Sequence, residues 1–438
     1  MRAPVKVLVA TSIAHFINDG TLYIFITLFP KLLPSQLFLI GVLGGMQNLS
    51  SAAASPFVGR RADKSKNYGS LLSFGLILMA VGVIGYAGSV LFFRSGSVEM
   101  FFYLLPFTII AGIGSSFYHP IGAAAIHGQW GSGHNVGRAM GFNGAMGSLG
   151  RALYPLFVVT LVVYFEVPSI SILAVVTFVG AAIASSVFRG VQAASQTKQE
   201  ALSTQGAAAK GSNTTYADEK RQEAELGDEI KNKSRVSQPS SVVPMRDILP
   251  RVFGLSIISF MRSILSSGVV YFIPVYLATV RNFGYGFQLG IAFSSMLGMA
   301  VIGQPIFGSL ADRIGRRTTL GISIAGASIS MILFVNTSDP LLSSIILAMF
   351  GFFVFTAFPL LMPLANSVVP EGAGTTSGSI VWGIGTVGGM ATGPFIVGLL
   401  SEKQFLGSLT SSFYVVSLIA LFSLVILPFV PNPRKNGK

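Results

Sequence analysis

The segment from residue 7 to residue 33, VLVATSIAHFINDGTLYIFITLFPKLL, is an apolar run with an acid near its middle. It is long enough to cross a bilayer, which takes about 20 helical residues. His15 and Tyr23 lie one helical turn on either side of Asp19, so the three side chains share a face. An ionisable group at that depth costs ~2.5 kcal/mol or more unless it faces protein or water. We therefore expect Asp19 to be functional; the alternative is a structural acid satisfied by a neighbouring helix.

Composition indicates that this segment is one of many. The 438 residues are 51% hydrophobic and only 10% charged, whereas a soluble protein carries ~25% charged residues. Apolar runs of spanning length recur along the chain. They predict an all-α membrane protein with twelve transmembrane helices, in residues 7–33, 37–58, 70–92, 99–127, 134–164, 168–189, 250–280, 285–310, 317–337, 340–368, 373–400 and 405–430.

The basic residues predict the orientation of these helices. If both termini are cytoplasmic, 23 of the 29 Lys and Arg residues lie on the inner side, and Arg151 and Arg262 lie within spans. Only Lys31, Arg94, Arg281 and Lys403 fall on the other side, and this asymmetry is what the positive-inside rule describes. The net charge of +13 therefore reflects topology and not a nucleic-acid partner. We expect a multi-pass monomer in the cell (plasma) membrane, whose basic inner loops touch anionic lipid of the bilayer weakly.

Residues 190–249 interrupt the series of apolar runs. They are rich in Ser, Gln, Ala, Lys and Glu, and they hold too few large apolar side chains to form a core. We expect a cytoplasmic, largely disordered linker between an N-terminal six-helix half, residues 1–189, and a C-terminal six-helix half, residues 250–438. Charges at helical spacing in residues 216–231 leave a short surface helix open as an alternative there.

The two halves resemble each other in sequence. Pro120 and Pro359 stand 239 positions apart, as do Pro155 and Pro394. A shared offset at separate landmarks predicts two parallel repeats related by an axis along the membrane normal, with a site between them near the midplane. The same offset relates Gly144 to Gly383 and Gly150 to Gly389, and the loops after the second and eighth spans share Gly59, Ala62, Asp63 and Lys64 with Gly308, Ala311, Asp312 and Arg313.

The loop after the eighth span, GSLADRIGRRT, resembles the cytoplasmic signature loop of the major facilitator superfamily, and the loop after the second span keeps part of it. Twelve spans in two repeats extend the resemblance to the whole chain and imply the major facilitator fold. In that family the loop Asp is thought to latch the cytoplasmic side, and an acid near a helix N-terminus gains ~0.3–1 kcal/mol. For the arginines, topology alone is the alternative. The implied gating motif comprises Gly59, Asp63, Lys64, Gly308, Asp312, Arg313, Arg316 and Arg317.

Two shorter motifs resemble the fosmidomycin-resistance-like efflux branch of this superfamily. They are His15-x-x-Asn18-Asp19 in the first span and Tyr118-His119-Pro120 in the fourth. Members of that branch are proton-driven exporters, so the resemblance implies export. The fifth span loosely resembles the antiporter motif of the superfamily, although close helix packing is the alternative for its small residues. Those small residues are Gly141, Gly144, Gly147 and Gly150.

Four ionisable groups lie inside the predicted spans: Asp19, His119, Arg151 and Arg262. The resemblance implies that spans one, four, seven and ten line the cavity, where Asp19, His119 and Arg262 could converge. A charge in hydrocarbon needs a partner, so we expect Asp19 to pair with Arg151 within one half or with Arg262 across the halves. Asp19, His15 and His119 are the residues expected to couple protons. Those expected to bind substrate are Arg151, Arg262, Asn18, Tyr23, Gln47, Asn143, Tyr154 and Trp382.

These groups suggest a coupling mechanism. Burial favours the protonated form of Asp19 and a neighbouring guanidinium favours the carboxylate, so an arginine that moves would load or release a proton. The histidines could relay that proton, and two buried arginines favour an anionic substrate. The sequence therefore predicts a secondary active transporter that exports small organic anionic or amphipathic compounds against protons. The alternative is a proton-coupled importer of an organic acid or another anionic metabolite.

The sequence lacks the motifs that are typical of other functional classes. The sequence contains no phosphate-binding Gly-Lys-Ser/Thr loop, so we do not expect ATP hydrolysis to supply the energy. It contains no HExxH motif and no cysteine, so we expect no metal site, no cofactor and no catalytic residues. A receptor or an intramembrane enzyme on the same fold is a third hypothesis, and it predicts no counterflow in liposomes.

Overall fold

The computed structural model describes residues 3–65, 67–130, 135–210, 243–370 and 373–431, and these residues are almost entirely helical with no strand. Eleven of the described helices are long and apolar enough to cross a membrane. Pro340–Val354 is a shorter apolar helix, and the helix that follows it completes a twelfth crossing. The all-α fold with twelve spans in two repeats is thus confirmed.

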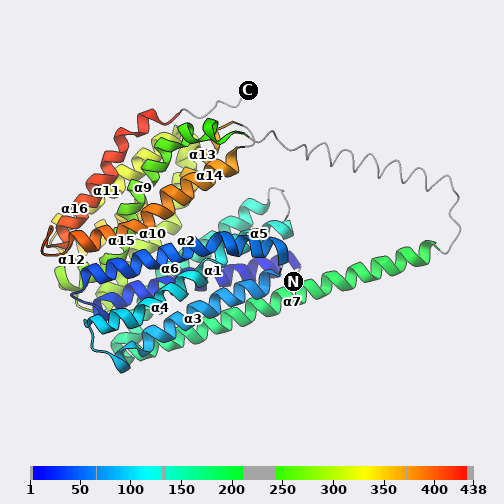
Figure 1. The fold of residues 1–438 in the computed structure, drawn as a ribbon, viewed down its shortest axis with the longest axis horizontal. Coiled ribbons are helices and arrows are strands. Elements are labelled where there is room, and N and C mark those ends of the chain that lie inside the picture. The colour runs from blue at the N-terminus through cyan, green and yellow to red at the C-terminus, as the bar shows by residue number, and fades with distance from the viewer. Residues whose placement is uncertain (1–2, 66, 131–134, 211–242, 371–372, 432–438) are drawn as a thin grey trace.

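The two halves of the chain form the two halves of the bundle (Figure 1). The N-terminal half contains α1 (Ala3–Leu32), α2 (Leu37–Ser65), α3 (Tyr68–Phe92), α4 (Val98–Ser115), α5 (Tyr118–Trp130), α6 (Asn135–Phe165), the short turn η1 (Val167–Ile170) and α7 (Ser171–Lys210). The C-terminal half contains α9 (Met245–Val275), η2 (Tyr276–Val280), α10 (Phe287–Ile314), α11 (Arg316–Asn336), α12 (Pro340–Val354), α13 (Ala357–Ser367), α14 (Gly374–Ile380), η3 (Val381–Val387), α15 (Gly388–Leu400), α16 (Leu409–Phe422), η4 (Ser423–Val425) and η5 (Leu427–Phe429).

The predicted linker differs in part from the structure. Helix α7 continues to Lys210, so residues 190–210 are helical where we expected disorder, and α9 begins at Met245. The physical reason is that α7 leaves the apolar region without a proline to stop it, and its Ala- and Gln-rich sequence favours helix. The rest of the predicted linker up to residue 242, with the surface helix left open at 216–231, lies outside the described residues.

The fourth and tenth spans are each broken near the middle, where we expected one continuous segment. The first break separates α4 from α5 at Ser116, and the second separates α12 from α13 at Phe355. Pro120 and Pro359 lie four residues after these two positions, and a proline removes the helical hydrogen bond to the carbonyl four residues before it. The repeat therefore has a broken helix at the same place in both halves.

Helix packing repeats between the halves as well. Helix α1 packs on α6 as α9 packs on α15, and α3 packs on α7 as α11 packs on α16. Backbones approach at equivalent glycines: Gly150 lies against the carbonyl of Phe16, and Gly389 lies against the carbonyl of Phe260. The Gly150–Gly389 match was predicted from sequence, and its cause is this close approach, which excludes a larger side chain.

The halves meet through two equivalent pairs of helices, α2 with α15 and α6 with α10 (Figure 1). The glycines in these contacts, such as Gly41 against Pro394 and Gly290 against Val159, lie toward the ends where α2 and α10 begin. We call this the opposite end. The basic end is where α2 and α10 finish, beside Arg60, Arg61, Lys64, Arg313, Arg316 and Arg317.

At the basic end the halves part. Helix α5 packs on α1, α3 and α6 of its own half, and α13 packs on α11 and α14 of the other. Space is open where a Cβ would stand at Gly141 and Gly144 on α6 and at Gly383 on η3. The structure is therefore closed at the opposite end and open at the basic end.

Replacing Gly150 by valine should destabilise the fold. A Cβ there would meet the backbone of Phe16, which cannot move aside as a flexible side chain can. Forced overpacking of this kind costs about 1–3 kcal/mol, so the melting temperature of the purified protein should fall. Gly144→Ala is the control, because no atom lies near its Cβ position. Equal melting of the two variants would show that this close approach does not limit stability.

Candidate functional site

Small residues bring α1 against α6 and so position the site. A Cβ at Gly147 would meet the ring of His15, and on α1 a Cβ at Gly20 would meet the ring of Tyr154. Together with Gly150, these glycines let the two helices approach closely. Close packing, the alternative reading of the fifth-span glycines, thus applies to Gly147 and Gly150 but not to Gly141 and Gly144.

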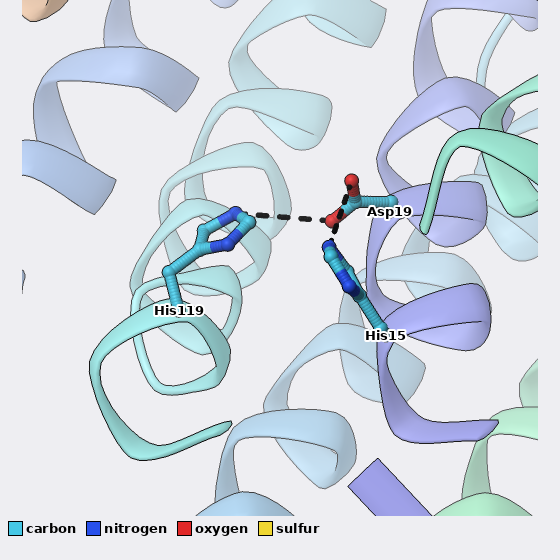
Figure 2. Close-up of side chains that lie close together, drawn as sticks. All are labelled: His15, Asp19 and His119. Carbon is cyan, nitrogen blue, oxygen red and sulfur yellow. Dashed lines mark ion pairs between the residues drawn. The ribbon is translucent and has the colours of Figure 1, made fainter. Parts of the chain in front are cut away.

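Asp19 is the centre of a cluster of charged and polar groups within the N-terminal half. Its residue is only 6% exposed. One carboxylate oxygen, Oδ2, lies 3.4 Å from His15 Nε2 and 3.6 Å from Arg151 Nε. The other, Oδ1, lies 3.8 Å from His119 Nε2 and accepts a hydrogen bond of 3.0 Å from Asn18 Nδ2. Figure 2 shows the two histidines converging on Asp19 from α1 and α5. The predicted proton-coupling residues therefore lie together.

The orientation of the His15 ring follows from its other nitrogen. His15 Nδ1 lies 2.8 Å from the backbone carbonyl oxygen of Asn143. A carbonyl can only accept, so Nδ1 carries a proton and Nε2 is the nitrogen that faces Asp19. A bare Nε2 beside a carboxylate would place two lone pairs together. The contact becomes favourable when one further proton lies between Nε2 and the carboxylate.

Tyr118 holds the same ring from another side. Its ring stacks on His15 with centroids 4.3 Å apart, and its hydroxyl contacts Asn143 Oδ1 at 2.9 Å and the Thr11 carbonyl at 3.0 Å. Tyr118 was absent from the predicted site, although the motif Tyr118-His119-Pro120 had pointed to it. Asn143, expected to bind substrate, is buried and positions His15 in this structure, so its contact with substrate stays a prediction.

Arg151 links the cluster to the other half of the protein. Besides Asp19, its guanidinium contacts Ser148 Oγ at 2.8 Å. Its Cζ also lies 5.9 Å from the centre of the Phe355 ring, at the break between α12 and α13. A cation within about 6 Å of an aromatic ring is attracted to it. Of the two predicted partners of Asp19, the structure thus selects Arg151, whose environment includes the facing half.

Arg262 does not join this cluster: among the described residues, no ion pair links it to Asp19. It is 4% exposed, and it donates a hydrogen bond to the carbonyl of Val354, the last residue of α12. The next carbonyl, that of Phe355, accepts from Gln304 at 3.3 Å. The break in the tenth span leaves carbonyls without helical partners, and a cation at a helix C-terminus is favourable there. Arg262 is thus not the ion-pair partner of Asp19, and both its convergence on the cavity and its binding of substrate stay predictions.

The other predicted substrate residues lie along the boundary between the halves or near it. Gln47 on α2 accepts a hydrogen bond of 2.7 Å from the hydroxyl of Tyr271 on α9. The ring of Tyr23 lies 6.0 Å from that of Phe293 on α10. Tyr154 is buried against Phe16 on α1, and Trp382 is half-buried near the start of η3.

Solvent reaches the cluster through His119. Its side chain is 64% exposed although it contacts the buried Asp19, and it lies directly after the break that begins α5. Because the halves part at the basic end, an exposed group near the middle of the bundle faces water and not lipid. Of the two imidazoles beside the buried carboxylate, His119 is therefore the one that lies between Asp19 and water.

The predicted gating motif is disengaged in this structure. Asp63, Lys64, Asp312 and Arg313 are exposed, and among the described residues neither acid forms an ion pair. No atom lies near the Cβ positions of Gly59 and Gly308. Arg316 is half-buried, and Arg317 donates to the carbonyl of Val430 at 3.1 Å. This agrees with halves that are separated at the basic end.

The same three side chains are spaced as metal ligands could be. Ligand atoms of His15, Asp19 and His119 all lie within 4.8 Å of one another. The Arg151 guanidinium beside the same carboxylate already supplies a positive charge, which disfavours a divalent cation and suits a proton. The absence of a metal site therefore stays a prediction that the charge balance supports.

Comparison with known proteins shows which family model and which relatives this chain matches. A family model described as Major Facilitator Superfamily matches residues 11–388. The multidrug resistance protein MdtG of Serratia proteamaculans is 30% identical over 189 residues, which cover 40% of this chain and 44% of that protein. The multi-drug resistance efflux pump PmrA of Streptococcus pneumoniae is 30% identical over 180 residues, covering 39% and 43%. The chain thus matches less than half the length of either relative.

The fold also matches solved structures over nearly the whole chain. The crystal structure of a D-xylose-proton symporter superposes with a TM-score of 0.68 at 12% identity, and the match covers 98% of both chains. At that identity the likeness establishes the fold alone. It agrees with the twelve-span architecture and with the two repeats described above.

Replacing Arg262 by methionine should lower stability. The change keeps an apolar stem but leaves the Val354 carbonyl buried without its donor, which costs about 1–3 kcal/mol. Differential scanning fluorimetry of the purified protein should show a lower melting temperature. Arg251→Met, which removes an exposed arginine of the same helix, should not. If both variants melt as the parent does, Arg262 is not required to cap the broken span.

Proposed function

We propose that this chain, which belongs to the Major Facilitator Superfamily, is a secondary active transporter that exports small organic anionic or amphipathic compounds in exchange for protons. Proteins of this family are transporters and not enzymes. The observation that carries the proposal is the buried Asp19, held between two histidines and Arg151. The relatives named for multidrug resistance and efflux support export.

The coupling step follows from the position of Arg151. With the basic end open, Arg151 lies beside Asp19 and favours its ionised form, so a proton leaves through His15 or His119 to water. Arg151 also contacts Phe355 of the facing half, so rocking of the halves changes its distance from Asp19. In the state open at the opposite end, Asp19 without its guanidinium takes up a proton. One cycle then carries protons toward the basic end and substrate away from it.

The orientation belongs to the same proposal. From the positive-inside rule we infer that the basic end and both chain termini lie in the cytoplasm. Protons then move inward down their gradient while substrate leaves the cell. We place the protein in the plasma membrane as a monomer, with the lipid bilayer, protons and a small-molecule substrate as its partners.

A proton-coupled importer is the second candidate, and the Asp19–Arg151 pair is the observation that favours it. An anionic substrate that takes Arg151 leaves Asp19 buried without a cation, so Asp19 would bind a proton and both would travel together. The two candidates differ in the sign of proton movement relative to substrate. A pH-sensitive dye inside proteoliposomes, followed during net flow of substrate down its own gradient, separates them.

Asp19→Asn should abolish proton-driven transport while leaving substrate exchange partly intact, because an amide cannot take up the coupled proton. Proteoliposomes with an imposed pH gradient measure the first activity, and equilibrium exchange of labelled substrate measures the second. Glu99→Gln is the control, since it removes an exposed acid at the start of α4. Unchanged proton-driven flux in Asp19→Asn would remove Asp19 from the coupling role.

Asp312→Asn should raise the population that is open at the basic end, because the predicted latch acts when that end closes. An acid at a helix terminus contributes enough to shift the ratio of states about two- to fivefold. The native chain has no cysteine, so Ser65→Cys and Ser309→Cys, exposed positions on α2 and α10, can carry a pair of spin labels. An Asp312→Asn distance distribution identical to that of the parent would contradict the latch.

A further inference from the structure

One charged hydrogen bond joins the two halves at the opposite end. Glu402 lies in the turn that follows α15, and its Oε1 accepts a hydrogen bond of 3.1 Å from the backbone N–H of Phe38. Phe38 is the second residue of α2. The N–H groups of a first helical turn have no partner within the helix. Glu402 thus caps a helix that belongs to the other half of the protein.

Both partners are held firmly by their own half. The Glu402 backbone closes a tight turn, since its carbonyl accepts from Phe405 N at 2.9 Å and from Gly407 N at 3.1 Å. Gly407 has a φ of +70°, which suits glycine and lets the chain turn back. On the N-terminal side, Gln36 just before α2 donates to the carbonyl of Gly96 at 3.0 Å. The carboxylate and the helix terminus are therefore placed by rigid structure.

The bond forms only when α2 and α15 are in close contact. Beside it, Gly41 faces the Pro394 carbonyl and Gly398 faces the Leu37 carbonyl. The rings of Phe38 and Phe395 meet with centroids 5.6 Å apart. Separation of these helices at the opposite end would take Phe38 out of reach of Glu402.

The equivalent position in the other half is built differently. Glu166, which follows α6, lies 3.9 Å from Lys31 of its own half. Where α6 meets α10, the contact is between the rings of Tyr164 and Phe287, 5.8 Å apart. Among the described residues, a carboxylate of one half therefore caps a helix of the other half at the contact of α2 with α15, but not at the contact of α6 with α10.

We propose that Glu402 is a latch that holds the opposite end of the bundle closed. A contact made in only one of two states shifts their equilibrium toward that state. The carboxylate adds to this because a negative charge is favourable at a helix N-terminus, and removing such a contact changes a ratio of states by about two- to fivefold. The proposal goes beyond the transport function, because it requires no particular substrate or coupling ion.

Spin labels at Ser95→Cys and Ser338→Cys test the latch. Both positions are exposed at the opposite end, one in each half, and the native chain has no cysteine to interfere. Pulsed electron paramagnetic resonance on the full chain in nanodiscs measures the fraction with separated labels. Glu402→Ala should raise the ratio of open to closed molecules at this end about two- to fivefold. Glu402→Gln should raise it less, because the amide oxygen still accepts from Phe38 while the charge is lost.

Glu166→Gln is the matched control, since it neutralises an acid at the same end whose partner is in its own half. It should leave the distance distribution unchanged. The latch is overturned if Glu402→Ala leaves the distribution as in the parent, or if Glu166→Gln shifts it equally, which would indicate a general effect of charge. If Glu402→Ala fails to fold, Glu402→Gln carries the same test, because it preserves the shape of the side chain. A variant that shifts the distance distribution supports the latch whether or not its proton-driven transport changes. The latch and the proposed proton mechanism can therefore fail independently.

Discussion

Compensation of the buried Asp19 carboxylate is the interaction on which the polar centre of the N-terminal half depends. A single negative charge among apolar helices is costly unless a cation or a proton accompanies it. Arg151 supplies the cation, and His15 and His119 are the groups that we propose take the proton. These partners come from α1, α5 and α6. The helix contacts that hold the N-terminal half together are therefore the same contacts that assemble the cluster around Asp19.

The halves have the same architecture but have diverged in their polar interiors. In the N-terminal half, the residues near the broken fourth span include the exposed His119, which connects a buried acid to water. In the C-terminal half, the equivalent break has Arg262 bound to a backbone carbonyl. One half thus holds the cluster of ionisable side chains, while the other presents a surface, including Phe355, against which Arg151 packs.

The spans, the repeat and the acid at the centre of the site could be predicted from sequence, because apolar length, a constant offset and an isolated charge are local properties. The choice of Arg151 over Arg262 could not, since it depends on how neighbouring helices rotate about their axes. The bond of Arg262 to a backbone carbonyl could not be predicted either, because hydropathy does not show that the tenth span is broken and leaves carbonyls in need of a donor. Tyr118 was missed because stacking on His15 depends on the α4–α5 break, which is likewise invisible in hydropathy.

The backbone contacts at Gly150 and Gly389 have a mechanical consequence. At both places a main chain rests directly on another main chain, with no side chain between them that could change rotamer and absorb a displacement. Sliding of α1 along α6, or of α9 along α15, would meet immediate steric resistance. Each bundle of helices should therefore move as a stiff body, so that a displacement imposed at one end of α1 or α9 is carried along the whole helix.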